Sequence, residues 1–119
     1  MREKILIWCA LCGLAGVATS CVSTQKSLYS WENYEKVSYD YSKDQTDQRL
    51  AKLDECFDKM TAKQKGTRKT VPPGIFAEKA YLLVKKGKKH EALAMLDKEI
   101  ELYPESKPFI DKIKKQIEE

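Results

Sequence analysis

The side chains with most capacity for chemistry in this chain are one histidine, 18 carboxylates and four cysteines. His90 follows Lys88 and Lys89, with no cysteine or second histidine at ligand spacing, whereas a metal site needs several convergent donors. Carboxylates such as Asp97 and Glu99 alternate with lysines in the pattern of a solvent-exposed helix face. No Ser/His/Asp order, phosphate-binding glycine loop or His-Glu helix motif is present. We therefore predict a protein that is not an enzyme, with no metal, cofactor or small-molecule substrate.

Cys21 is the cysteine with a clear chemical context. It follows a basic start at residues 1–4, an uncharged apolar run at residues 5–18, and the small residues Thr19 and Ser20. This is the order of an export signal, and the apolar run is shorter than the roughly 20 residues of a membrane span. Small residues directly before a cysteine resemble the lipobox of bacterial lipoprotein signals, in which the thiol is diacylated. We predict cleavage before Cys21 and lipidation of its thiol.

Cleavage would leave residues 21–119, a length that suits one small domain. The signal takes two of the 22 basic and one of the 18 acidic residues with it, so the net charge changes from +4 to +3. So mild a charge does not favour nucleic acid as a partner. Cys56 is then the remaining cysteine besides Cys21, so no intramolecular disulfide is expected. In an oxidising compartment we expect its thiol to be buried.

The elements that must position these residues are helices, because from residue 31 onward apolar residues recur at spacings of three and four. We predict a signal peptide over residues 1–20, a lipidated tether over 21–30 and a helical domain over 31–119. A polar loop at residues 64–74 interrupts the helices. We predict five helices. The first spans residues 32–43, and the second starts after an N-cap at Thr46. The third runs from Pro73 to a C-cap at Gly87, the fourth spans residues 89–103, and the fifth starts after an N-cap at Ser106.

Each predicted helix has one apolar face, which we expect to point into the core. We also expect Tyr39 to lie off the face of the first helix. The expected inward residues are Trp31, Tyr34, Val37 and Tyr41; Leu50, Leu53, Phe57 and Met60, with Cys56 on the same side; Phe76, Ala80, Leu83 and Val84; Ala92, Leu93, Leu96 and Ile100; and Phe109, Ile110, Ile113 and Ile117.

Residues 73–106 form a 34-residue unit that resembles a tetratricopeptide repeat. The residues at its motif positions are Phe76, Ala80, Gly87, Ala92 and Pro104. Glu99 departs from the pattern, because the repeat usually has a small residue there. Residues 31–63 show no such motif positions, which leaves open whether they form a true second repeat. We predict an all-α fold, a short tetratricopeptide-like array of antiparallel helical hairpins with a C-terminal capping helix.

The whole layout also resembles an uncharacterised family of small Gram-negative outer-membrane lipoproteins. The matching stretches are the Trp- and Tyr-rich residues 29–41, residues 72–78 (PPGIFAE) and residues 102–106 (LYPES). Members of that family are typically encoded beside a lipoprotein similar to the curli secretion channel. The resemblance implies an outer-membrane location facing the periplasm and a role in an envelope assembly, but it implies no mechanism.

Two surfaces are candidates for binding a partner. Residues 29–41 hold more Tyr and Trp than one helix face can bury, and such residues are favoured in interfaces. Residues 85–89 form the densest basic cluster, whose simpler interpretation is favourable cations at a helix end. The alternative for residues 85–89 is contact with anionic headgroups or with an acidic partner. The same two interpretations apply to the loop residues Lys65, Arg68 and Lys69. The predicted partner-binding residues are Tyr29, Tyr39, Lys85, Lys86, Lys88 and Lys89.

These observations together predict a non-enzymatic lipoprotein. It would attach to the outer membrane through its N-terminal lipid and act as an adaptor or assembly factor for another envelope protein, such as a secretion-channel-like lipoprotein complex. The alternative is an envelope-structural lipoprotein that binds peptidoglycan.

Overall fold

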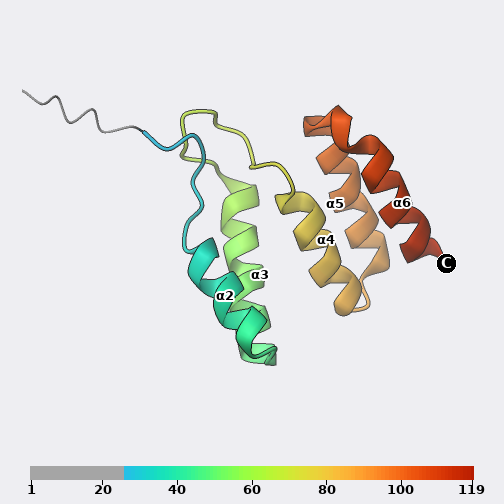
Figure 1. Ribbon diagram of the computed structural model, residues 1–119, viewed down its shortest axis with the longest axis horizontal. Helices are drawn as coiled ribbons and strands as arrows, with labels where there is room; N and C mark the ends of the chain where they lie inside the picture. Colours follow the sequence, from blue (N-terminus) through green and yellow to red (C-terminus); the bar gives the residue numbers. More distant parts are fainter. Residues whose placement is uncertain (1–25) are drawn as a thin grey trace, which may run out of the picture.

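The computed structural model describes residues 26–119 and is helical without strands over that range (Figure 1). The predicted signal, Cys21 and the cleavage site lie outside the described residues. Five α-helices and one 3₁₀-helix follow one another along this part of the chain. They are α2 (Tyr34–Lys43), α3 (Asp47–Ala62), α4 (Ile75–Lys85), α5 (Lys89–Leu102), η1 (Pro104–Ser106) and α6 (Lys107–Glu118).

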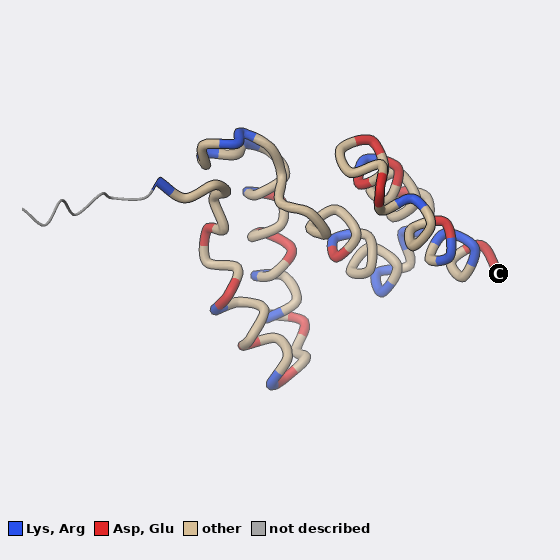
Figure 2. The backbone as a smooth tube through the Cα atoms, turned by 45° about the horizontal axis from the view of Figure 1, so that its top comes forward, with Lys and Arg blue, Asp and Glu red and all other residues tan. Residues whose placement is uncertain are grey.

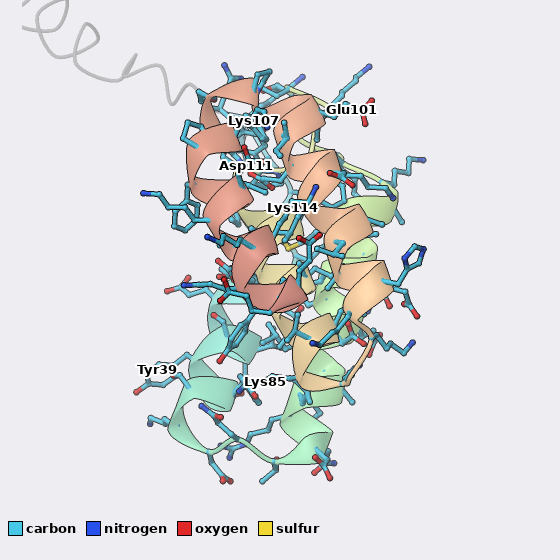
Figure 3. All side chains as sticks on the ribbon, turned by 90° about the vertical axis from the view of Figure 1, so that its right-hand side faces the viewer. Tyr39, Lys85, Glu101, Lys107, Asp111 and Lys114 are labelled. Atoms are coloured by element: carbon cyan, nitrogen blue, oxygen red, sulfur yellow. The ribbon has the colours of Figure 1, made fainter. Side chains whose placement is uncertain are left out.

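The helices form an array in which each α-helix packs mainly against the next one in the chain (Figure 1). Helices α2 and α3 form one antiparallel hairpin, α4 and α5 form a second and more extensive one, and α6 closes the array on α5. Seen along the array, α2 and α6 lie on one side and α3 and α5 on the other (Figure 3). The predicted all-α array of hairpins is confirmed.

Two clusters of buried apolar side chains hold the array together, and helix α4 contributes to both. Full burial of a large apolar side chain stabilises a fold by about 1.5–3 kcal/mol. Helix α4 therefore joins the two hairpins into one domain. The first cluster contains Val37, Leu53, Cys56, Phe57, Met60, Val71, Ile75, Phe76 and Leu82, and the second contains Ala80, Leu83, Ala92, Leu96 and Ile110.

Two of the predicted helix caps are confirmed by their hydrogen bonds. The Thr46 hydroxyl accepts a hydrogen bond from the Arg49 N–H at 3.3 Å, which satisfies a donor in the first turn of α3. After α4, Gly87 has a φ of 75° and donates to the Val84 carbonyl, while the Lys88 N–H donates to the Leu83 carbonyl at 2.8 Å. This pair of bonds is the Schellman motif, which needs the left-handed conformation that glycine adopts at low cost.

The predicted start of α4 at Pro73 is wrong. Gly74 has a φ of 88°, which helical backbone cannot adopt, and the helix begins at Ile75. The Ile75 N–H donates to the Pro72 carbonyl, so residues 72–75 form a turn that leads into the helix. A left-handed glycine placed directly after two prolines therefore moves the helix start by two residues.

Three predictions about the ends of helices also need correction. Ser106 directly precedes α6, but its hydroxyl donates to the Tyr103 carbonyl and does not cap that helix. Phe109 is 64% exposed rather than inward, because it lies on a face of α6 that the neighbouring helices leave open, whereas Ile110 is buried as predicted. Trp31 is partly exposed because it precedes the first turn of α2.

Residues 27–30, which we assigned to the tether, are bound to the loop between α3 and α4. The main-chain N–H groups of Thr67 and Arg68 donate to the carbonyls of Ser27 and Leu28, each at 3.1 Å. These bonds run across the wide sequence gap between the N-terminal segment and the loop. The folded domain therefore includes the chain from Ser27 onward.

Burial of Cys56 is confirmed, and it leads to a prediction about thiol reactivity. Burial raises the pKa of the Cys56 thiol, and the thiolate is the form that reacts. In residues 21–119 carrying Cys21→Ser, we expect iodoacetamide to alkylate Cys56 about tenfold or more slowly in the native state than in urea. Because the unfolded chain loses this proton at a lower pH, stability should fall as the pH rises past the ordinary thiol value. Equal alkylation rates in the two states would contradict the burial.

Candidate partner-binding groove

An apolar groove opens between α2, α4 and α6, with side chains of α3 at its base. It consists of two adjoining cavities of about 390 Å³ and 450 Å³, which share Ala77, Tyr81 and Ile113. Volumes of this size are typical of ligand pockets. The first cavity is also lined by Ser38, Tyr41, Leu53, Phe57, Glu78, Leu82 and Phe109, and the second by Val84, Lys89, Gln116 and Ile117.

The groove exists because α4 is apolar on more faces than its neighbours cover. Its buried residues face the two core clusters, while Ala77, Tyr81 and Val84 repeat at spacings of four and three along a further face. On α6, Phe109, Ile113 and Ile117 repeat every four residues and line the same groove. Small Ala77 leaves space between the larger side chains of the two helices.

Two large aromatic side chains stand exposed in this groove. Tyr81 is 60% exposed and Phe109 is 64% exposed, although both line a concave apolar surface. Aromatic side chains in such settings supply much of the binding energy at protein interfaces. The arrangement is therefore suited to bind an apolar segment, and Phe57 and Leu82 close its floor.

Lys85 places a positive charge at the rim of the groove (Figure 3). Its Nζ donates to the Tyr41 hydroxyl at 3.1 Å and to the Gln45 side chain at 3.3 Å. It also lies 5.1 Å from the centre of the Tyr81 ring, a cation–π distance. The hydrogen bond to Tyr41 raises the pKa of Lys85, so the ammonium stays charged at neutral pH.

Glu78 lies on the other side of the same cavity and is tied to α2. The Tyr34 hydroxyl donates to Glu78 Oε2 at 2.6 Å, and burial together with this bond raises the pKa of Tyr34. The Tyr34 hydroxyl is a neutral donor and leaves the charge of the Glu78 carboxylate in place, so the groove is bordered by this acid as well as by the cations Lys85 and Lys89.

A family model matches residues 28–113 of the chain, and its description is a domain of unknown function, DUF4810. The chain belongs to the DUF4810 family. The match begins inside the segment bound to the loop and extends into α6, so the DUF4810 domain includes most of the groove. No curated protein and no solved structure gives a significant match.

The basic turn of this DUF4810 domain does not act as one cationic patch. Lys86 forms an ion pair with Asp54 of α3, and Lys88 pairs with Glu91 at 3.3 Å. Lys85 contacts α2, as described above, and Lys89 lines the second cavity of the groove. Of the four lysines predicted to bind a partner, the structure therefore brings Lys85 and Lys89 to the groove.

The two tyrosines predicted to bind a partner lie outside the groove of the DUF4810 domain. Tyr39 is 57% exposed on the outer side of α2, where Lys43 Nζ lies 4.5 Å from its ring centre (Figure 3). The Tyr29 hydroxyl accepts a hydrogen bond from Arg68 at 2.8 Å, and its ring packs against Trp31. Tyr29 therefore helps to hold the N-terminal segment on the loop.

The sequence prediction missed Tyr81 and Phe109 as groove residues. The sequence could have indicated Tyr81, because α4 carries more apolar residues than a single inward helix face can bury. Phe109 was assigned to the core on periodicity alone, and periodicity does not tell which neighbours a terminal helix has.

Glu99 of the DUF4810 domain is buried, so its predicted place on a polar face is wrong. The side chain is 2% exposed, and Oε1 accepts a hydrogen bond from the Gly74 N–H at 2.7 Å. Its other oxygen has no hydrogen-bond partner among the described residues. The residue that departs from the repeat motif thus fixes the turn before α4, and no second buried acid of the described chain accompanies it.

Within residues 26–119 no group of three or more His, Cys, Asp or Glu side chains could hold a metal ion. None of the helices in the same range is long and apolar enough to cross a membrane.

Proposed function

We propose that the protein is a non-enzymatic, lipid-anchored adaptor whose groove receives an apolar segment of another envelope protein. The observation that carries this proposal is the concave apolar surface between α2, α4 and α6, with Tyr81 and Phe109 exposed in it. A soluble domain gains nothing in stability from keeping such side chains in water, whereas an interface uses them.

The chemistry of the groove defines the segment that would fit. Its floor is apolar, and the cations Lys85 and Lys89 lie along its rim. An amphipathic helix with acidic residues beside its apolar stripe matches both properties. In such helix-in-groove binding, the apolar face supplies the affinity and the charges set the orientation.

The envelope location rests on the sequence. The signal-like residues 1–20 precede Cys21, whose lipidation would attach the mature protein to the outer membrane, facing the periplasm. The resemblance to lipoproteins encoded beside a curli-secretion-channel-like lipoprotein supports a complex of that kind as the partner.

Two tyrosines of similar exposure, Tyr81 and Tyr39, provide a matched test of the groove. We expect Tyr81→Ala to lower the yield of a photo-crosslink between position 113 in the groove and its envelope partner by about tenfold, the loss typical of a central aromatic contact. Tyr39→Ala should leave the yield unchanged, because it removes a similarly exposed ring beside a lysine on the outer side of α2. Crosslinking in intact cells followed by mass spectrometry measures both.

Two other outcomes of this crosslinking experiment would contradict the proposed groove. A loss with Tyr39→Ala and none with Tyr81→Ala would assign the interface to the outer side of α2 and reject the groove. If no protein crosslink forms and the protein sediments with purified sacculi, the peptidoglycan-binding alternative is correct.

A further inference from the structure

The N-terminal segment and the loop between α3 and α4 form one bound unit at the end of the array where the described chain begins (Figure 1). Besides the main-chain bonds described above, the Gln64 side chain accepts from the Ser30 N–H at 2.9 Å and donates to the Ser30 carbonyl at 3.2 Å. Gly66 lies so close to Leu28 and Tyr29 that a Cβ at this position would overlap their main chains. The segment is therefore fixed on the loop from Ser27 onward.

This unit is strongly cationic. Residues 63–69 carry Lys63, Lys65, Arg68 and Lys69 and no acidic residue, and Lys26 precedes the bound segment. Figure 2 shows these basic positions gathered near the start of the described chain. We refer to Lys26 together with the four cations of residues 63–69 as the basic loop face.

The neighbouring charges do not cancel the basic loop face. Lys65 pairs with Glu32 at 3.3 Å, and Arg68 is held by the Tyr29 hydroxyl. Lys63 and Lys69 are exposed. At the same end of the helices, the end of α5, η1 and the start of α6 carry the acids Glu101 and Glu105 beside Lys107, so this neighbouring region does not extend the cationic surface (Figure 3).

The position of the predicted anchor limits how far this surface can be from a membrane. Ser27 lies six residues after Cys21, and an extended chain spans at most about 3.3–3.6 Å for each residue, so the two Cα atoms can be at most about 20–22 Å apart. A lipid on Cys21 would therefore hold the loop within reach of the headgroups. The turn between α2 and α3 lies at the opposite end of the helices (Figure 1).

We propose that the basic loop face rests on the anionic headgroups of the membrane to which Cys21 is attached. This inference rests on the lipid anchor of the proposed function. Each cation near an anionic surface raises the membrane-binding constant by about fivefold. The acyl chains already attach the protein, so the four or five cations of this face would serve to orient it. The helices then stand upright on the bilayer and the groove opens sideways, towards proteins in the same membrane.

A depth measurement on the intact lipoprotein tests this orientation. The acylated protein, carrying a fluorophore at Thr67→Cys or at Gln48→Cys, is reconstituted into vesicles of phosphatidylethanolamine and phosphatidylglycerol that contain a headgroup-attached nitroxide. Both positions are exposed, and Gln48 lies in the first turn of α3 whereas Thr67 lies in the loop that follows the other end of that helix. We expect strong quenching at position 67 and little at position 48. Replacing phosphatidylglycerol by neutral phosphatidylcholine should reduce the quenching at position 67 at least twofold.

Charge variants separate the headgroup contact from the tether. The double substitution Lys63→Gln with Lys69→Gln should reduce the quenching at position 67, whereas Lys43→Gln with Lys115→Gln changes the charge equally but away from the basic loop face and should not. Equal quenching in neutral and anionic vesicles, or no effect of the loop substitutions, would overturn the proposal. So would loop substitutions that weaken a protein crosslink in cells but leave the vesicle quenching unchanged, since the face would then bind an acidic protein.

Vesicle flotation and the mass of the acylated protein are recorded in the same samples. A protein that carries no acyl chains and does not float contradicts the anchor itself. A protein that floats normally but shows no quenching at position 67 contradicts the basic loop face alone, so the two failures are distinguishable.

Discussion

Cys21→Ser should abolish palmitate labelling and keep mature-sized protein out of the membrane fraction. Acyl chains contribute about 0.8 kcal/mol for each buried CH₂ group, and while one chain gives only reversible binding, several hold a protein on a membrane in effect permanently. Serine cannot form the thioether on which this anchor depends. Metabolic labelling and fractionation of cells that produce the full chain measure the result.

Two cysteines within the predicted signal supply the control for this substitution. Cys9 and Cys12 follow the large residues Trp8 and Leu11, which do not suit a cleavage site. Cys12→Ser should therefore be processed and labelled as the unchanged protein is. Normal processing and acylation of Cys21→Ser would refute the lipoprotein interpretation.

Ala92→Leu should destabilise the domain by about 1–3 kcal/mol, the usual cost of forcing extra methylene groups into a packed core. Ala92 has no exposed surface and belongs to the cluster that joins α4, α5 and α6. A larger side chain would push α4 and α5 apart, because α4 places Ala80 in the same cluster. Urea unfolding followed by circular dichroism measures the change in free energy.

The same substitution two residues later isolates the effect of packing. Ala94 is exposed on α5, so Ala94→Leu changes the helix propensity and the residue volume in the same way without entering the core. It should alter the free energy of unfolding by less than about 0.5 kcal/mol. If Ala92→Leu and Ala94→Leu change the free energy of unfolding by the same amount, then Ala92 does not lie where two helices approach closely.

Features determined by neighbouring residues in the chain could be predicted from the sequence. The N-cap at Thr46, the left-handed turn at Gly87 and the end of α5 before Pro104 all depend on the local backbone, and all are confirmed. The apolar spacing along α3 and α5 also predicted most of their inward residues, and Leu53, Phe57 and Leu96 are buried.

Features set by distant residues could not be predicted. Glu99 is buried because it binds the Gly74 N–H of another helix start, a partner that its own surroundings in the chain do not indicate. Phe109 is exposed because the helices around α6 leave that face open, and the groove forms only where α2, α4 and α6 come together. The attachment of residues 27–30 to the loop depends on the fit between Gly66 and a segment far away in the chain.

The order of the helices has a consequence for how the protein folds. Because each helix packs mainly on its neighbour in the chain, few large loops must close before native contacts form, and such topologies fold fast, in microseconds to milliseconds. The bonds between residues 27–30 and the loop are an exception, since they join segments more than 30 residues apart. We expect them to form last and to open first, so hydrogen exchange in the N-terminal segment should be faster than in α4 and α5.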